Sequence, residues 1–251
     1  MHMSTSGFYD QMSDYYHLIY PDWPNSIRRQ AGHLDAILTE HCRSGGRQLL
    51  DAACGIGTQS LGLAMLGYEV TASDISPKSV ERLLREAADR RLSLNGSVAD
   101  MTRAYEHHQR QFDAVLACDN AVPHLLSDEL IVQAFEQFYR CTRDGGCCIV
   151  SVRAYSGEPR YDTVFQPYGI RSFQDKKLIL FQVQEYEGIQ YNVSMYFIED
   201  GPSPCPTYVM KSRYYAVTVD KLASLLRQAG FREVVQADDA FFQPVLIGLK
   251  R

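Results

Sequence analysis

The chain of 251 residues contains no cluster of lysine and arginine, no CxxC pair and no run of about 18 apolar residues. Without such a run no helix is expected to span a membrane, and the first residues lack the basic and apolar regions of a signal peptide, so we expect a cytoplasmic protein. The net charge of −5 argues against a nucleic-acid partner, because such binding requires neutralised phosphates. The seven cysteines show no zinc-ligand spacing, so we expect reduced thiols in the core and no metal site.

Short apolar runs alternate with helical periodicity from Gln48 to Val152, a pattern typical of βα units on a parallel sheet. In one unit Ser76 and Pro77 predict a helix start, followed by positions expected to face the sheet: Val80, Leu83, Leu84 and Ala87. Ser127 and Thr218 are expected to cap two later helices, and the chain closes with a pair of strands. The pattern predicts an α/β fold with a doubly wound, Rossmann-like, seven-stranded sheet.

Residues 153–217 differ from this pattern, because alternating apolar and polar positions flank Glu187 and Gly188 as in an antiparallel hairpin. We therefore expect three parts: a helical N-terminal lid segment (1–47), a core (48–152 and 218–251), and a β-rich substrate lid inserted after strand five (153–217). Most of the 16 tyrosines fall within 9–20, 155–196 and 208–215, mainly outside the core. We expect their polar rings around a cleft.

Two glycines stand one residue apart in "LLDAACGIGTQS", directly after the first predicted strand. Such a turn lets a nucleotide-like ligand approach the backbone at the carboxyl edge of the sheet. The dinucleotide fingerprint has a third small residue, usually glycine or alanine, where this chain has Ser60. Two further acids, Asp74 and Asp100, end the second and third strands, where they could hold a ribose and an exocyclic amine. This arrangement favours a nucleoside without phosphates.

These stretches resemble motifs of the class I S-adenosylmethionine-dependent methyltransferases: "LLDAACGIGTQ", "VTASD" and "VADM". The resemblance implies that the glycines admit the methionine part, that Asp74 binds the ribose and that Asp100 with Met101 holds the adenine. The cofactor-binding residues that it implies are Arg28 (or its neighbour Arg29), Asp51, Ala53, Gly55, Gly57, Asp74, Ile75, Asp100, Met101 and Cys118. The alternative is a glycine turn whose acids only cap helices.

Four further segments are similar to the glycine and sarcosine N-methyltransferase branch: "YHLIYPDW", "CDNAVPHL", "SVRAY" and "SRYYAVT". This resemblance implies that Arg153 grips a substrate carboxylate, with Asn120 beside it and tyrosines around the amine. The residues expected on the acceptor side are Tyr20, Asn120, His124, Arg153, Tyr214 and Tyr215. Where the pattern has glycine this chain has Asp119, which favours a larger or more cationic amine than glycine.

Several of these side chains have a structural alternative. Arg153 could form a surface ion pair, His124 could be a structural hydrogen-bonding group, and Tyr214 and Tyr215 cannot both face one side of a strand. Since a sulfonium is already an electrophile, we expect catalysis to depend mainly on orientation, with Tyr20 or His124 as candidate proton acceptors.

Three other functions remain open from the sequence. One is an N- or O-methyltransferase of a natural product or amino sugar, and another is a cofactor-binding protein without turnover. An NAD-dependent oxidoreductase is the third, disfavoured by Ser60 and by the lack of a Tyr-x-x-x-Lys pair after the fourth strand. The oligomeric state and the methyl acceptor cannot be read from the sequence.

Overall fold

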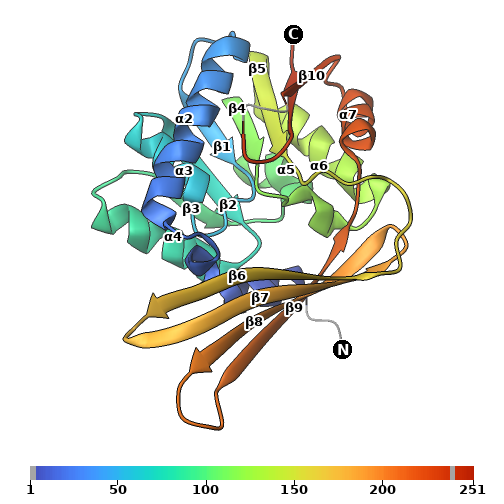
Figure 1. Ribbon diagram of the computed structural model, residues 1–251. Helices are drawn as coiled ribbons and strands as arrows, with labels where there is room; N and C mark the ends of the chain where they lie inside the picture. Colours follow the sequence, from blue (N-terminus) through green and yellow to red (C-terminus); the bar gives the residue numbers. More distant parts are fainter. Residues whose placement is uncertain (1–3, 238–240) are drawn as a thin grey trace.

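The computed structural model describes residues 4–237 and 241–251, which contain two β-sheets (Figure 1). The larger sheet has seven strands in the order β10-β11-β5-β4-β1-β2-β3, as expected for a doubly wound fold. Its strands are β1 (Gln48–Asp51), β2 (Glu69–Asp74), β3 (Asn95–Val98), β4 (Phe112–Ala117), β5 (Thr142–Ser151), β10 (Glu233–Ala237) and β11 (Val245–Leu249). Strands β1 to β5 pair in parallel, whereas β11 is antiparallel to both of its neighbours. The strand order changes direction between β1 and β4.

Helices cover both faces of this sheet (Figure 1). One face carries α2 (Trp23–His41), α3 (Thr58–Met65) and α4 (Pro77–Asp89); the other carries α5 (Ala104–His108), α6 (Asp128–Cys141) and α7 (Val219–Gln228). The predicted caps are confirmed, because the side chains of Ser76, Ser127 and Thr218 each accept a hydrogen bond from a backbone N–H in the first helical turn. Within the described ranges, none of the helices has the length and apolar character needed to cross a bilayer.

One expectation about burial needs correction, and another holds at the edge of the sheet. Leu84 faces the sheet as expected, but it is 39% exposed because α4 lies over the edge strand β3, where Leu84 rests on Gly96. The cysteines are free thiols as expected, but they are not all core residues: Cys42 is half-buried and Cys205 is exposed. Cys205 lies between β8 and β9, in a connection that contributes nothing to a core.

The smaller sheet follows strand five, as expected, and has four antiparallel strands rather than one hairpin. They are β6 (Thr163–Phe173), β7 (Lys176–Glu187), β8 (Gln190–Asp200) and β9 (Thr207–Tyr215). It forms a layer beside the α/β core, and α1 (Thr5–Met12) lies against it (Figure 1). Phe8, Met12 and Leu18 pack with the buried side chains of β7 and β8, so the N-terminal segment joins the two sheets.

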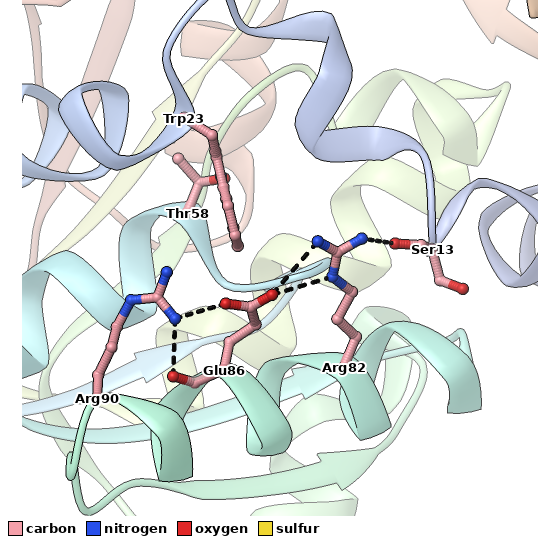
Figure 2. A network of polar contacts seen from close by, with 6 residues as sticks. All are labelled: Ser13, Trp23, Thr58, Arg82, Glu86 and Arg90. Atoms are coloured by element: carbon pink, nitrogen blue, oxygen red, sulfur yellow. Dashed lines mark hydrogen bonds and ion pairs between the residues drawn. The ribbon is translucent and has the colours of Figure 1, made fainter. Parts of the chain in front are cut away.

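A polar network fixes this N-terminal segment to the core (Figure 2). Arg82 of α4 donates to the backbone carbonyl of Ser13 at 2.6 Å and also pairs with Glu86, which Arg90 holds from the other side. The guanidinium carbons of both arginines lie 5.5 Å from the ring centre of Trp23, whose indole N–H donates to the Thr58 hydroxyl at 2.9 Å. The segment is therefore held over α4 and the start of α3.

Candidate active site

A cavity of about 350 Å³ lies at the carboxyl ends of β1, β2, β3 and β4. In open α/β sheets this edge, next to the change in strand order, is where ligands bind. The N-terminal segment contributes Thr5, Tyr9, Met12, Ser13 and Tyr16 to its lining. The predicted site residues that line it are Ala53, Gly55, Asp74, Ile75, Asp100, Met101, Cys118 and His124.

The two glycines of the turn have different structural roles. Gly57 has φ +95°, and a Cβ there would come within 2.2 Å of the Leu83 side chain, so this glycine is required by the packing of α3 on α4. Gly55 has φ +50°, and a Cβ there would meet no atom within 4 Å. Because Gly55 lines the cavity, the space beside it is available to a ligand.

Gly55→Val is expected to weaken cofactor binding roughly 10- to 100-fold, because its branched side chain would occupy that space at an overpacking cost of about 1–3 kcal/mol. Gly45→Val is a matched control, since Gly45 also has a positive φ and open space but does not line the cavity. Calorimetric titration with S-adenosylhomocysteine would show the loss in Gly55→Val only. Equal affinities in the two variants would contradict this role.

Asp74 is fixed by the turn that it faces. Its Oδ2 accepts from the Gly55 N–H at 2.8 Å and its Oδ1 accepts from the Ser76 N–H at 2.9 Å. Burial raises the pKa of this carboxyl, and the two backbone donors oppose that shift. A carboxylate has about four acceptor positions, so two remain for hydroxyl groups in the cavity.

The other two acids differ in their surroundings. Asp100 lines the cavity, and its Oδ1 accepts from the N–H and the hydroxyl of Thr102 at 2.8 Å each. Asp51 is buried below the cavity and is not among its lining residues. Its Oδ2 accepts from the Ser60 hydroxyl at 2.6 Å, and burial raises its pKa to about 6. Ser60, unusual for a dinucleotide turn, is thus the hydrogen-bond partner of Asp51.

Arg28 and Arg29 are exposed on α2 and do not line the cavity, so the structure does not bring the predicted cofactor-carboxylate ligands to this site. The same stretch instead turns Gln30 inward, where its side-chain oxygen accepts from Gln59 at 2.7 Å. Thr58 and Gln59 line the cavity at the start of α3. Sequence reasoning did not name these two residues, although their position directly after the glycine turn could have indicated that they line the site.

On the acceptor side, Asp119 gathers hydroxyl groups from the N-terminal segment. Its Oδ2 accepts from Tyr20 at 2.8 Å and from Tyr16 at 3.1 Å. Asp119 and Asn120 follow β4 with φ of +56° and +64°, a left-handed conformation that costs energy outside glycine and is common at functional sites. Asp119 lines the cavity at this turn.

Asn120 connects this turn to β5 and the small sheet. It is 3% exposed, and its Oδ1 accepts from the Arg153 N–H at 3.1 Å and from the Tyr155 hydroxyl at 3.2 Å. Its Nδ2 is buried and has no partner among residues 4–237 and 241–251. It is therefore a buried donor that a bound ligand could satisfy.

Arg153 lines a second cavity of about 380 Å³ together with Tyr155. Burial lowers the pKa of its guanidinium, but Tyr191, Tyr214 and Tyr155 outweigh this and raise it above the ordinary value. In the part of the chain that the structure describes, no carboxylate forms an ion pair with Arg153, so the predicted alternative of a surface ion pair is not observed. The residue is a cation without an acidic partner.

The tyrosine pair of β9 divides as expected. Tyr214 stacks on Tyr191 with ring centres 5.3 Å apart and lies 4.0 Å from the His124 ring. The Tyr215 hydroxyl instead donates to Asp128 Oδ1 at 2.9 Å, at the start of α6. Only Tyr214 joins the predicted acceptor group, because neighbouring strand residues point to opposite faces.

Sequence reasoning named tyrosine-rich segments but missed the individual partners of His124. The Tyr9 hydroxyl lies 2.8 Å from His124 Nε2, and the Ser212 hydroxyl lies 3.3 Å from Nδ1. Burial lowers the pKa of His124 to about 3. The ring is therefore neutral at pH 7 and is a weak base held between two hydroxyl groups.

This shift gives a pH-dependent prediction. Below about pH 6.5 the unfolded chain protonates His124, whereas the native protein does so only near its pKa of about 3, so wild-type stability falls with decreasing pH. Between about pH 7.5 and pH 5, the free energy of unfolding of wild type should fall by about 2 kcal/mol relative to that of His124→Asn, which lacks this titrating group. Urea unfolding of both proteins measures the difference. A gap that stays constant with pH would contradict a buried neutral ring.

Comparison with known proteins agrees with this geometry. Residues 49–146 match the family model described as a methyltransferase domain. Among curated relatives, a glycine/sarcosine N-methyltransferase of Parasynechococcus marenigrum is 30% identical over 134 residues, covering 53% of this chain and 46% of its own length. Another, from Halorhodospira halochloris, is 24% identical and covers 76% of this chain and 72% of its own. The matched stretch spans less than half the length of the first relatives.

Solved structures align over nearly the whole chain. The sugar N-methyltransferase KedS8 from Streptoalloteichus has a TM-score of 0.79 at 16% identity and covers 95% of this chain and 94% of its own. The predicted Rossmann-like methyltransferase fold is thereby confirmed. The match of residues 49–146 to a methyltransferase domain agrees with the predicted enzyme class.

Proposed function

We propose that this protein transfers a methyl group from S-adenosylmethionine to the amine of a small molecule that carries a carboxylate. The observation that carries the proposal is the juxtaposition of a nucleoside-sized cavity with an unpaired cation. The cavity lies over the strand ends, and Arg153 and the free Nδ2 of Asn120 lie beyond the β4 turn.

The residues around the first cavity fit this cofactor. The open space beside Gly55 leaves the backbone accessible, and Asp74 has two acceptor positions left for the ribose hydroxyls. Asp100 and Met101 line the part expected to hold the adenine. When bound, S-adenosylmethionine supplies an activated methyl group on a positively charged sulfur.

The acceptor side fits a carboxylate. Arg153 offers the planar guanidinium that binds carboxylates through paired hydrogen bonds, and Asn120 Nδ2 adds a buried donor. Neither group has an acidic partner among the described residues. A bound carboxylate would satisfy both.

The chain contributes orientation rather than strong base catalysis. His124, with a pKa of about 3, is a weak base, so its contact with the Tyr9 hydroxyl serves to orient that phenol. Orienting two reactants can lower a barrier by roughly 7–11 kcal/mol. Arg82 and Trp23 hold the N-terminal segment in place, and this segment contributes Tyr9, Ser13 and Tyr16 to the lining of the first cavity (Figure 2).

A two-stage experiment tests the proposal. Calorimetry with S-adenosylhomocysteine should give one site per chain, and a screen with labelled methyl donor should then give mass increases of one methyl group on amino acids such as glycine and sarcosine. Binding without turnover on any amine would instead support a cofactor-binding protein. Binding of reduced nicotinamide adenine dinucleotide in place of S-adenosylhomocysteine would support an oxidoreductase.

A second acceptor class is an amino sugar or another natural-product amine. The cavity of about 380 Å³ beside Arg153 gives more room than glycine requires, and it is lined by polar side chains such as Gln166 and Gln184. The structurally similar proteins also include CalS10 of Micromonospora echinaspora, described as an amino pentose methyltransferase, at a TM-score of 0.75 and 14% identity over 92% of this chain and 93% of its own. Product masses from the same screen separate the two classes.

The proposal includes a small-molecule partner and a cytoplasmic location. The net charge of −5 supports a small-molecule partner rather than nucleic acid, and the free thiols support a reducing, cytoplasmic location.

A further inference from the structure

The Asp119 carboxylate is held entirely by neutral donors. Tyr16 and Tyr20 both donate to Oδ2, and the Gln243 side-chain N–H donates to Oδ1 at 3.3 Å. Burial raises the pKa of both phenols well above the ordinary value, so they remain protonated donors at neutral pH. No lysine, arginine or histidine forms an ion pair with Asp119 within residues 4–237 and 241–251.

One acceptor position of this carboxylate remains open to a ligand. Two phenols fill the positions on Oδ2, whereas among the residues that the structure describes Oδ1 accepts only from Gln243 and keeps one position. Asp119 and Tyr16 both line the cavity of about 350 Å³, so this carboxyl residue borders the space that a ligand would occupy. An anion without a counter-ion beside a ligand cavity favours a positively charged group there.

Arg153, which forms no ion pair among the described residues, lies on the other side of Asn120. Asn120 follows Asp119 directly, and its Oδ1 accepts from the Arg153 N–H. Tyr9 and Tyr168 lie close enough to both charges to sense them: Asp119 raises the pKa of each phenol and Arg153 lowers it. Asp119 thus lines the first cavity and Arg153 the second, on either side of Asn120, and neither forms an ion pair among the described residues.

We propose that Asp119 is the specificity-determining residue of the acceptor site and binds the ammonium group of a zwitterionic acceptor whose carboxylate lies at Arg153. This inference rests on the proposed function and adds the charge state in which the acceptor is recognised. Tyr16, Tyr20 and Gln243 are positioning residues, because they fix the carboxylate without meeting the ligand through their hydrogen-bonding groups. Glycine at this position would remove the negative end of the site.

Asp119→Asn tests the inference with little change in shape. Asparagine tolerates the left-handed backbone at φ +56°, and its side-chain oxygen can still accept from a tyrosine. Asp128→Asn is the matched control, since Asp128 also accepts from a tyrosine hydroxyl, that of Tyr215, but lies outside both cavities. Thermal unfolding of both variants checks that the fold is kept.

The readout is calorimetric binding to protein saturated with S-adenosylhomocysteine. Sarcosine carries both charges, whereas N-acetylglycine keeps the carboxylate and lacks the ammonium. Asp119→Asn should bind sarcosine roughly 10- to 100-fold more weakly than wild type and N-acetylglycine equally well, whereas Asp128→Asn should match wild type for both. The affinities for S-adenosylmethionine and S-adenosylhomocysteine should not change.

Each other outcome overturns the inference in a distinct way. Equal losses for sarcosine and N-acetylglycine would mean that Asp119 does not recognise the ammonium. Weaker binding of S-adenosylmethionine alone would place the charge against the sulfonium, and weaker binding of both cofactor forms would place it against their amino group. Wild-type protein that binds S-adenosylhomocysteine but neither sarcosine nor N-acetylglycine would overturn the proposed amino-acid acceptor together with this inference. That result differs from a failure of the Asp119 inference alone, in which wild-type protein still binds sarcosine.

Discussion

Asp74→Ala should weaken S-adenosylhomocysteine binding by at least roughly 100-fold, because two charge-assisted hydrogen bonds to the ribose, of about 1.5–3 kcal/mol each, are lost together. The same change removes the acceptor for the Gly55 and Ser76 N–H groups, so the turn that faces the ligand loses its anchor. Titration calorimetry measures the affinity directly. Asp74→Asn keeps an acceptor oxygen but no charge, so its affinity for S-adenosylhomocysteine should lie between those of Asp74→Ala and wild type.

Asp113→Asn is a suitable control for the loss of a buried carboxylate. Asp113 is 2% exposed and pairs with Arg143 at the opposite part of β4, away from the cavity. The Asp113→Asn substitution should lower the unfolding temperature while leaving the affinity for S-adenosylhomocysteine unchanged. Wild-type affinity in Asp74→Ala would remove the ribose assignment.

The second large effect concerns the acceptor. Arg153→Ala should raise the KM for a carboxylate-bearing amine about 100-fold with a smaller change in kcat, because the guanidinium binds ground state and transition state alike. Cofactor affinity should be unaffected, since Arg153 does not line the first cavity. Steady-state kinetics at saturating methyl donor separates the two constants.

Arg160→Ala is the matched control for that substitution. Arg160 lines the same second cavity, but its guanidinium is already paired with Asp162 and lies over the Tyr186 ring. The Arg160→Ala substitution should leave the KM for the carboxylate-bearing amine within a few-fold of the wild-type value. Similar kinetics in Arg153→Ala and Arg160→Ala would contradict a carboxylate bound at Arg153.

The parts of the fold that depend on local sequence could be predicted. The N-cap hydroxyl of Ser76, the glycine turn at Gly55 and the periodicity of α4 are determined by residues within a few positions of one another. That four segments line one cavity could be predicted for a related reason, because the ends of parallel strands converge at one edge of the sheet. Leu84 faces the sheet as expected, but the sequence does not reveal that it lies over an edge strand, where it stays 39% exposed.

Long-range partners could not be predicted. Tyr20 reaches Asp119 across 99 positions and Tyr9 reaches His124 across 115, and both contacts depend on how the N-terminal segment lies over the core. Arg28 and Arg29 were expected at the cofactor from the resemblance alone, and the resemblance does not show which face of α2 turns inward, where the structure buries Gln30. Likewise, only the full strand pairing shows that β6 and β9 extend the expected hairpin to four strands.

The central claim is that the cavity over the strand ends binds S-adenosylmethionine through Asp74. A crystal structure with S-adenosylhomocysteine tests it most directly. We expect the ribose hydroxyls within hydrogen-bond distance of the Asp74 carboxylate and the amino-acid end of the ligand next to Gly55. A ligand bound elsewhere, or an empty cavity that nicotinamide dinucleotide fills instead, would contradict the account.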